Sequence, residues 1–374
     1  MYVEVHTLED LRAQLQTNSL DRVVVQGLDL RALSTPLRAV SAAGSAFLGC
    51  TLDPLTCAHV QQTGGIVFPR LEGLPYQPFR PALYTVGELM DGYRRGVPES
   101  FSTDTLDSRI YRHFQTNRAA CGPDSIMEAL AQRLHDHAID DAINDLLCDG
   151  QRQVAGVMGG HAMTRDDPRF RDVARIARQL AQAGLFVATG GGPGAMEAAN
   201  LGAWMSGRSL AQLDAAIDHL ATTPAYTDPG WLDTALDILE RFPDGGESLA
   251  VPTWFYGHEP SNLFSVHVAK YFANSIREDG LLAIATRGVI YAPGSAGTIQ
   301  EIFMDATQNH YGTFEVISPM VFLGRDYWTR EKPVYPLLMQ LAEGRAYRDL
   351  IAISDDTEEI TSFILDNPPQ PFKG

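Results

Sequence analysis

This chain of 374 residues lacks several features that would assign it to a special class of protein. Its few cysteines form no CxxC pair and have no histidine at zinc-site spacing, so we expect reduced structural thiols and no metal centre. They are Cys50, Cys57, Cys121 and Cys148. No apolar run approaches the roughly 20 residues that a membrane helix needs, and the first residues lack the regions of a secretory signal. We therefore expect a cytoplasmic protein with no membrane partner.

Positive charge is scarce as well. Lys and Arg number 29 against 46 Asp and Glu, which gives a formal net charge of −17 at pH 7. A broad electrostatic attraction to a phosphate backbone is missing, so we expect no nucleic-acid partner. A small anionic ligand remains compatible with this composition, because the N-terminus of a helix attracts an anion locally against the overall field.

The length of the chain favours two domains. Residues 1–150 are assigned to a small α/β domain of unknown role, because short apolar runs alternate with turns and a helical stretch ends at Gly150. Strands are expected in DRVVVQGLDL, GSAFLGCTLD and TGGIVFPRL, and a short helix in LTCAHVQQ.

Residues 151–374 follow a different rhythm, in which apolar runs such as RQVAGVMGG and GVIYAPG alternate with amphipathic stretches. Such alternation indicates a parallel sheet whose ligand sites lie at the carboxyl ends of the strands. The expected fold class is α/β, a Rossmann-like doubly wound parallel sheet behind the smaller α/β N-terminal domain. An insertion at about 208–246 interrupts the alternation, with helical pieces near 210–220 and 231–242.

Two glycine-rich turns in the second domain each follow an apolar strand and open a helix. They read TGGGPGAMEAA at 189–199 and APGSAGTIQE at 292–301. Glycine lets the backbone bend tightly near a ligand, and the unpaired N–H groups of a helix's first turn favour an anion. We expect both helix N-termini to face one crevice and to bind one phosphate-bearing ligand. The alternative is a pair of tight connections without a ligand.

Glu301 lies one turn into the helix that follows the second glycine turn. A carboxylate repels phosphate, but it suits a place where positive charge develops, such as a breaking glycosidic C–N bond, or where water must be oriented. The alternative is a capping box, T-x-x-E, in which Thr298 begins the helix and Glu301 reaches back to it. The sequence leaves both interpretations open.

A nicotinamide oxidoreductase is a third possibility for the first glycine turn. Gly190, Gly192 and Ala195 match the G-x-G-x-x-G/A spacing, which is a weak signal alone. That fold needs an acidic residue at the end of a second strand roughly 20 positions later. Residues 209–218, SLAQLDAAID, have helical spacing instead, so this function is disfavoured.

Together the two turns resemble motifs of the LOG family, whose members were once labelled possible lysine decarboxylases. The family carries GGGxxGLM and PGGxGTxxE, which stand here in the same order as GGGPGAM (190–196) and PGSAGTIQE (293–301). The first strand of the domain ends in Gly159-Gly160, as in the family. The resemblance covers roughly residues 152–360 apart from the insertion.

The resemblance implies hydrolysis of the N-glycosidic bond of a nucleoside 5′-monophosphate, which releases free base and ribose 5-phosphate. It further implies an AMP-like ligand, a homodimer, and neither a metal nor a redox cofactor. The alternative within the same fold is a nucleotide-binding sensor that does not turn over its ligand. The residues expected to bind the ligand are Gly159, Gly160, Gly190, Gly191, Gly192, Gly194, Met196, His258, Gly294, Ser295, Ala296, Gly297 and Thr298.

The sequence departs from the family at positions that matter for catalysis. Ser295 replaces the second glycine of PGG. The family's Arg-Lys pair matches HVAKYFANS best, which puts Ala269 at the arginine and Lys270 at the lysine. Arg277 or Arg287 is the candidate to replace the missing charge, so the expected catalytic residues are Glu301, Lys270 and Arg277. Lys270 as a solvated helix lysine, and His258 in a polar surface loop, are the alternatives.

Overall fold

The computed structural model describes residues 2–17, 20–118, 123–148, 150 and 152–372. Cys50, Cys57 and Cys148 are free thiols, and Cys121 lies outside the described residues. The chain forms two compact units, each made of two segments: Met1–Leu83 with Arg112–Asn144, and Tyr84–Tyr111 with Asp145–Gly374. Among the described residues, no helix is long and apolar enough to cross a membrane.

The first unit contains a four-stranded parallel sheet in the order β1-β2-β3-β4. Its strands are β1 (Val3–Val5), β2 (Val23–Gln26), β3 (Ala46–Leu48) and β4 (Ile66–Phe68). Its helices are α1 (Leu8–Gln16), α2 (Ser34–Leu37), α3 (Pro54–Gln62) and most of α7 (Pro123–Leu147). The three expected strands and the short helix α3 are therefore confirmed, whereas strand β1 was not predicted.

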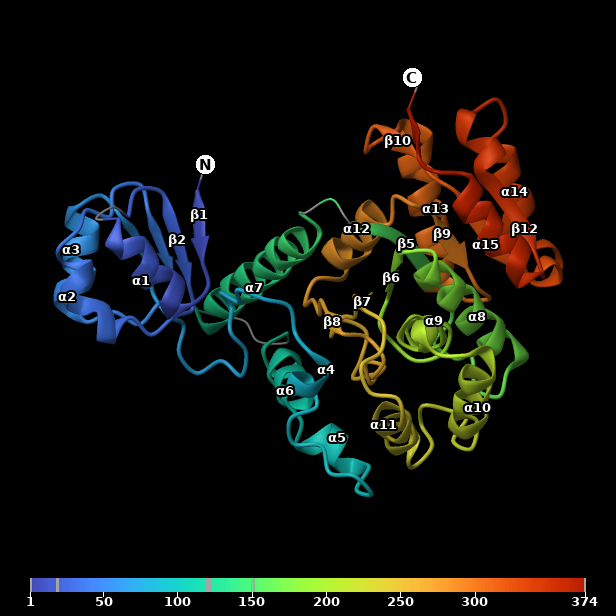
Figure 1. Ribbon diagram of the computed structural model, residues 1–374, viewed down its shortest axis with the longest axis horizontal. Helices are drawn as coiled ribbons and strands as arrows, with labels where there is room; N and C mark the ends of the chain where they lie inside the picture. The colour runs from blue at the N-terminus through green and yellow to red at the C-terminus, as the bar shows by residue number, and fades with distance from the viewer. Residues whose placement is uncertain (1, 18–19, 119–122, 149, 151, 373–374) are drawn as a thin grey trace. The chain divides into compact units, whose positions relative to one another are not determined.

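The second unit is built on a seven-stranded parallel sheet in the order β12-β11-β9-β5-β6-β7-β8 (Figure 1). The strands are β5 (Gln153–Met158), β6 (Leu185–Thr189), β7 (Ser248–Ala250), β8 (His267–Val268), β9 (Val289–Tyr291), β11 (Met320–Leu323) and β12 (Ile351–Ser354). The chain builds outward from β5 to β8 and then returns to the other side of β5 with β9. The strand order therefore reverses between β5 and β9, which is where doubly wound sheets bind ligands. The expected Rossmann-like fold class is confirmed.

Helices cover this sheet in two groups (Figure 1). The crossovers β5→β6 and β9→β11 run in opposite directions, so right-handed connections put α8 and α13 on opposite faces. Helix α8 packs against α9 and α15, and α13 packs against α12 and α14. The bounds are α8 (Pro168–Gln182), α9 (Ala195–Trp204), α12 (Asn274–Ile284), α13 (Ala296–Tyr311), α14 (Val334–Leu341) and α15 (Thr357–Asp366). A short antiparallel pair, β10 (Val316–Ile317) and β13 (Gln370–Pro371), lies outside the main sheet.

Helix α8 shows how the sequence fixes these elements. Asp167 caps its N-terminus by accepting the backbone N–H of Arg169 at 2.9 Å, and Pro168 occupies the first helical position, where no N–H donor is needed. Its apolar side chains recur at helical spacing, and six of them are buried in the core of the unit. They include Phe170, Val173, Ala177 and Leu180, the stripe that the sequence predicts.

The second unit also takes in residues 84–111, which precede the single boundary expected near residue 150. This segment carries α4 (Val86–Leu89), α5 (Glu99–Thr103) and the start of α6 (Leu106–Arg118). Tyr84 and Val268 exchange backbone hydrogen bonds of 3.0 and 2.9 Å, and Asp107 accepts the indole N–H of Trp254 at 2.8 Å. The division of the chain differs from the expected 1–150 and 151–374 because these partners lie far along the chain.

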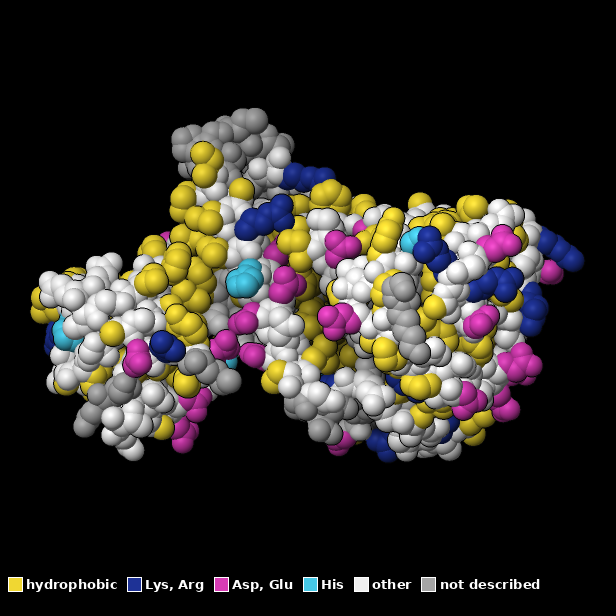
Figure 2. Space-filling model, turned by 90° about the horizontal axis from the view of Figure 1, so that it is seen from above, with side chains coloured by type: hydrophobic (Ala, Val, Ile, Leu, Met, Phe, Trp, Pro, Cys, Tyr) yellow, Lys and Arg dark blue, Asp and Glu magenta, His cyan; other side chains and the backbone are white. Residues whose placement is uncertain are grey.

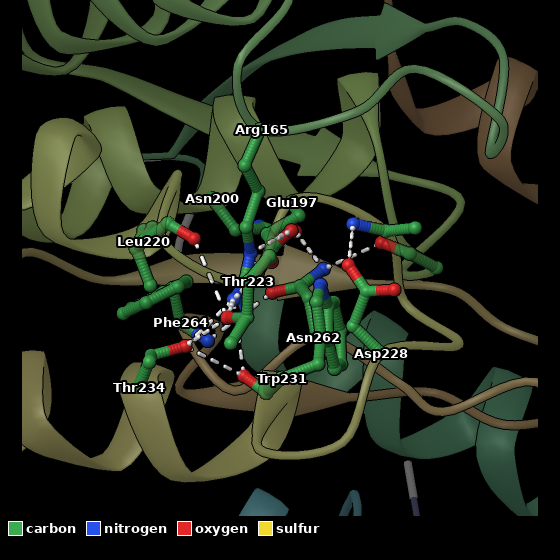
Figure 3. Close-up of polar contacts among 12 residues, drawn as sticks. Arg165, Glu197, Asn200, Leu220, Thr223, Asp228, Trp231, Thr234, Asn262 and Phe264 are labelled. Carbon is green, nitrogen blue, oxygen red and sulfur yellow. Dashed lines mark hydrogen bonds and ion pairs between the residues drawn. The ribbon is translucent and has the colours of Figure 1, made fainter.

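The insertion consists of α10 (Leu210–Leu220) and α11 (Trp231–Arg241), as its helical spacing predicts. A buried arginine joins it to the sheet (Figure 3). Arg165 Nη2 lies 2.5 Å from Glu197 Oε1 of α9, and Arg165 Nη1 donates to Thr234 Oγ1 of α11 at 2.8 Å. The guanidinium also lies 4.3 Å from the ring centre of Trp231. One ion pair thus links the β5–α8 connection, α9 and the insertion.

Figure 2 shows acidic and basic side chains intermixed on one face of the molecule.

Removal of Glu197 tests the buried ion pair. Glu197→Ala leaves the guanidinium of Arg165 buried without its carboxylate, so we expect a loss of about 3–5 kcal/mol in the free energy of unfolding. Glu240→Ala is the control, because Glu240 lies in an exposed pair with Arg95 and its removal is expected to cost at most about 1 kcal/mol. Denaturant unfolding followed by tryptophan fluorescence reports on the second unit, since it holds all the tryptophans: Trp204, Trp231, Trp254 and Trp328.

The double variant Arg165→Met with Glu197→Leu removes both charges and is expected to regain most of that loss. A change below about 1 kcal/mol for Glu197→Ala would show that the pair does not stabilise the unit.

Candidate functional site

Three backbone turns meet at the carboxyl ends of neighbouring strands β6, β5 and β9. They are residues 159–160 (the β5 turn), 190–194 (the β6 turn) and 293–297 (the β9 turn). The N–H of Gly160 donates to the carbonyl of Pro293 at 3.0 Å, and the carbonyl of Gly160 accepts the N–H of Ala195 at 3.2 Å. The β5 turn therefore ties together the two glycine turns that the sequence singles out.

Close approach, rather than flexibility, explains the glycines at two positions. Gly194 has a φ of +71°, and a Cβ there would lie 2.4 Å from the carbonyl oxygen of Gly160. A Cβ at Gly294 would lie 2.1 Å from Thr298 Oγ1 and 3.0 Å from the nitrogen of Gly160. A side chain at either position would push the turns apart.

A cavity of about 750 Å³ opens over these turns. Its lining includes most of the residues expected to bind a ligand or to act in catalysis. These are Gly159, Gly160, Gly190, Gly192, Met196, Gly294, Ser295, Ala296, Gly297, Thr298, Arg277 and Glu301. The connections after β5, β7 and β11 and helix α12 add further lining residues, among them His161, Asp167, Arg169, Tyr256, Glu259, Glu278, Tyr327 and Lys332.

Glu301 is nearly buried in the wall of this cavity, with 8% of its surface exposed. Its Oε1 lies 3.4 Å from Nη1 of Arg277, which stands on α12, the helix before β9. Burial raises the pKa of Glu301 to about 7 against the lowering effect of the Arg277 charge, and the Glu278 carboxylate raises it further. The side chain can therefore hold or release a proton near neutral pH.

The structure excludes the capping box as the role of Glu301. Helix α13 begins at Ala296, two residues before Thr298, and the residue before it, Ser295, makes no side-chain cap. The carboxylate of Glu301 points to Arg277 instead of back to its own helix. The tight β9 turn starts the helix earlier than the T-x-x-E pattern indicates.

Arg277 is held in place by its own helix. Its Nε and Nη2 donate to Oδ1 of Asn274 at 3.2 and 3.0 Å. Asn274 in turn donates to the hydroxyl of Tyr256, a residue of the cavity lining, at 2.9 Å. Of the two arginines named from the sequence, Arg277 is the one in the cavity lining, and its Nη1 lies beside Glu301.

Lys270 occupies a different place from the one expected of a catalytic lysine. It follows β8 rather than standing on a helix, it is 1% exposed, and its Nζ lies 2.8 Å from Oδ1 of Asp107. Burial raises the pKa of Asp107, but Lys270 and His258 together outweigh burial and hold that pKa at about 2. Lys270 is not among the residues that line the cavity, but its Nζ lies 3.4 Å from Oγ of the lining residue Ser261. Lys270 was expected to supply positive charge for catalysis, but its charge neutralises the buried carboxylate of Asp107 instead.

His258 is also outside the cavity lining. Its ring stacks between Phe101, with ring centres 4.5 Å apart, and Tyr111, with ring centres 5.0 Å apart. Its Nε2 lies 3.4 Å from Oδ2 of Asp107. His258 thus holds the connection after β7 against residues 84–111, and its chain neighbour Glu259 lines the cavity instead.

Two glycines of the β6 turn serve the fold rather than the cavity lining. Gly191 has a φ of +76° and packs against Ala250 and Pro252, and Gly194 packs against the β5 turn. Asn262, which is fully buried, donates to the carbonyl of Gly192 at 3.2 Å and so fixes the path of this turn.

Lys332 and Tyr327 were missed by the sequence analysis. Lys332 Nζ donates to the carbonyl of Gly294 and to Ser295 Oγ, both at 3.1 Å, and the Tyr327 hydroxyl donates to the same carbonyl at 2.5 Å. Both residues follow β11, whose carboxyl end lies at the same edge of the sheet as β9. This placement could have predicted both residues, but only if the order of the strands in the sheet had been known. Lys332 brings a positive charge to the rim of the β9 turn.

No family model and no curated protein sequence matches this chain. Among solved structures, a molybdenum cofactor binding protein from the phototrophic bacterium Rippkaea orientalis is similar, with 14% identity and a TM-score of 0.38. The match covers 57% of this chain and 96% of that one. A likeness at this level carries no argument about function, so the fold and the site rest on the strand order and the contacts described above.

The raised pKa of Glu301 predicts how stability responds to pH. The folded-state pKa of about 7 exceeds the ordinary value of 4.5. Below pH 4.5 the acid is protonated in both the folded and the unfolded state, so its burial costs nothing extra. As pH rises through 7 the buried acid must ionise, and the free energy of unfolding falls. Glu301→Gln keeps the shape without the charge. We expect it to match the wild type near pH 4.5 and to exceed its free energy of unfolding by on the order of 2–3 kcal/mol at pH 8.

Denaturant unfolding at the two pH values checks this. Burial also raises the pKa of Asp305 to about 7, but Asp305 contributes equally to both proteins and cancels in the comparison. The exposed control Glu343→Gln is expected to change stability by less than about 0.5 kcal/mol at either pH. Equal stability of Glu301→Gln and wild type at pH 8 would contradict an environment that disfavours the ionised carboxylate.

Proposed function

We propose that the cavity binds a nucleoside 5′-monophosphate and hydrolyses its N-glycosidic bond, releasing free base and ribose 5-phosphate. The observation that carries this proposal is the meeting of the three turns at the strand-order reversal, with the buried carboxylate of Glu301 in the same cavity wall. The resemblance of the two glycine turns to the LOG family supports the same activity.

The 5′-phosphate would lie on the β9 turn. Helix α13 is 16 residues long, and its first residues, 296–298, line the cavity. Backbone N–H groups in the first turn of a helix have no intrahelical acceptor and favour an anion. Lys332 stands at the same turn and adds a full positive charge. This arrangement attracts a dianion locally although the whole chain carries a formal charge of −17.

The reacting bond would lie beside Glu301, about one helical turn, or ~5.4 Å along the axis, from the phosphate site. As the C–N bond breaks, positive charge develops on the ribose, and a carboxylate in a buried site stabilises that charge strongly. Glu301 would also guide the attacking water. Arg277 keeps the carboxylate oriented and supplies the positive charge that the sequence analysis sought from Lys270.

The arrangement gives no support to a nicotinamide oxidoreductase. The strand after the β6 turn and its helix is β7, which is reached only after the insertion and ends at Ala250. An apolar residue stands where a dinucleotide-binding fold places the acid that holds the ribose hydroxyl.

The direct test is release of free base from a panel of nucleoside 5′-monophosphates, separated by chromatography. We expect the wild type to release base from at least one of them. Glu301→Ala is expected to lower kcat at least about 100-fold, while calorimetry shows nucleotide binding little changed, because the carboxylate acts on the sugar and not on the phosphate. Binding without base release by the wild type would instead indicate the nucleotide sensor.

A second prediction concerns Lys332. A charge-assisted hydrogen bond contributes about 1.5–3 kcal/mol, so Lys332→Ala is expected to raise the KM for the nucleotide roughly 10- to 100-fold with kcat little changed. Arg330→Ala is a matched control, since Arg330 is 79% exposed and pairs with Asp326. Binding of the corresponding nucleoside, which lacks the phosphate, should not respond to either change. An equal loss for nucleoside and nucleotide would rule out a phosphate contact for Lys332.

A further inference from the structure

A second carboxylate is buried in the same cavity wall as Glu301. Glu278 follows Arg277 on α12 and is 2% exposed. Its Oε2 accepts a hydrogen bond of 2.5 Å from Nε2 of Gln300, and its Oε1 lies 3.6 Å from Nη2 of Arg277. Glu278, Gln300, Glu301 and Arg277 all line the cavity. Two acids are thus gathered around one guanidinium.

This arrangement is unfavourable for folding. Burying a carboxylate costs free energy unless a positive charge compensates, and here one arginine serves two acids. Arg277 does not need Glu278 as a partner, because Asn274 accepts from its Nε and Nη2 and Glu301 lies at its Nη1. The contact of Glu278 with the guanidinium is the longer of the two ion pairs, 3.6 Å against 3.4 Å. A structural role for Glu278 would be met as well by glutamine, without the charge.

We propose that Glu278 is a second catalytic carboxylate, the base that takes a proton from the attacking water, while Glu301 gives its proton to the leaving base. The inference rests on the proposed function, but it assigns activation of the attacking water to Glu278 instead of Glu301. Hydrolysis of a glycosidic bond commonly uses two such carboxyl groups, one as acid and one as base. The acid is the one whose surroundings favour the protonated form.

The step balances with the groups in the cavity. The water oxygen forms a bond to C1′ of the ribose as the C1′–N bond breaks, and the electron pair of that bond stays on the nitrogen of the base. The nitrogen takes the proton of Glu301, and Glu278 takes a proton from the water. Glu301 ends ionised and Glu278 protonated, and proton exchange with solvent restores both. Arg277 stays charged beside both acids throughout.

The pKa of about 7 for Glu301 supports its part in this division, because a substantial fraction carries a proton at neutral pH. Charged and titratable groups that interact with it include Arg277 and Glu278 on α12 and Tyr291 on β9, whose hydroxyl donates to Asp305. Gln300 donates to Oε2 of Glu278, so the oxygen that would take the proton from water is Oε1, whose ion-pair contact with Arg277 is long at 3.6 Å.

The test compares Glu278→Gln, Glu278→Ala and the matched control Asp279→Asn, which removes a charge from the exposed neighbouring position of α12. We expect Glu278→Gln to lower kcat at least about 100-fold with nucleotide binding by calorimetry within about threefold of wild type. Asp279→Asn should keep wild-type kcat. Azide needs no base, so it should restore base release by Glu278→Ala and form ribosyl azide 5-phosphate, detectable by mass spectrometry.

The outcomes distinguish the role of Glu278 from the proposed function itself. If Glu278→Gln keeps kcat within about threefold while Glu301→Gln loses it, the inference is wrong and the proposed function stands. Loss of nucleotide binding in Glu278→Gln, or loss of turnover in Glu278→Ala without an azide product, would assign Glu278 to positioning and also overturn the inference. If the wild type releases no base from any nucleoside monophosphate, the proposed function and the inference fall together.

Discussion

Two backbone hydrogen bonds at Gly160 are the constraint on which the site depends. Through its N–H and its carbonyl, this residue joins the turns after β6 and β9, which belong to crossovers running in opposite directions. The approach is so close that glycine is needed at Gly194 and Gly294. Because the turns cannot separate, residues of the β6 turn and the first residues of α13 line one cavity, and Glu301 is carried there with α13.

The charged side chains around the three turns differ both in burial and in pairing. The cavity wall holds Glu301 and Glu278 with Arg277 between them, while Lys332 stands at the rim of the β9 turn. Lys332 is half-buried, whereas both acids are buried in the wall. Among the described residues, none of the insertion lines the cavity, and Arg165 anchors the insertion to the connection that follows the β5 turn.

The sequence predicts well wherever the signal is local. The stripe of α8, the two helices of the insertion and the strand before each glycine turn depend on residues a few positions apart, and all of them form as expected. Lys270 was misplaced because a short lysine-containing match cannot reveal Asp107, a partner 163 positions away. Lys332 and Glu278 were missed for the same reason, since neither belongs to a pattern with its neighbours in the chain.

The amino-acid sequence by itself determined the class of fold, the order of its strands and helices, the glycine turns and the position of an acid one turn beyond the second of them. Those features follow from local periodicity and from the steric freedom of glycine. Only the tertiary structure decided that Arg277, and not Lys270, faces Glu301, that a second acid shares the cavity, and that residues 84–111 pack with the later part of the chain. These contacts join residues that are remote in the chain. Spacing along the sequence cannot show that Lys270 is neutralised by Asp107 while Arg277 is left to face Glu301.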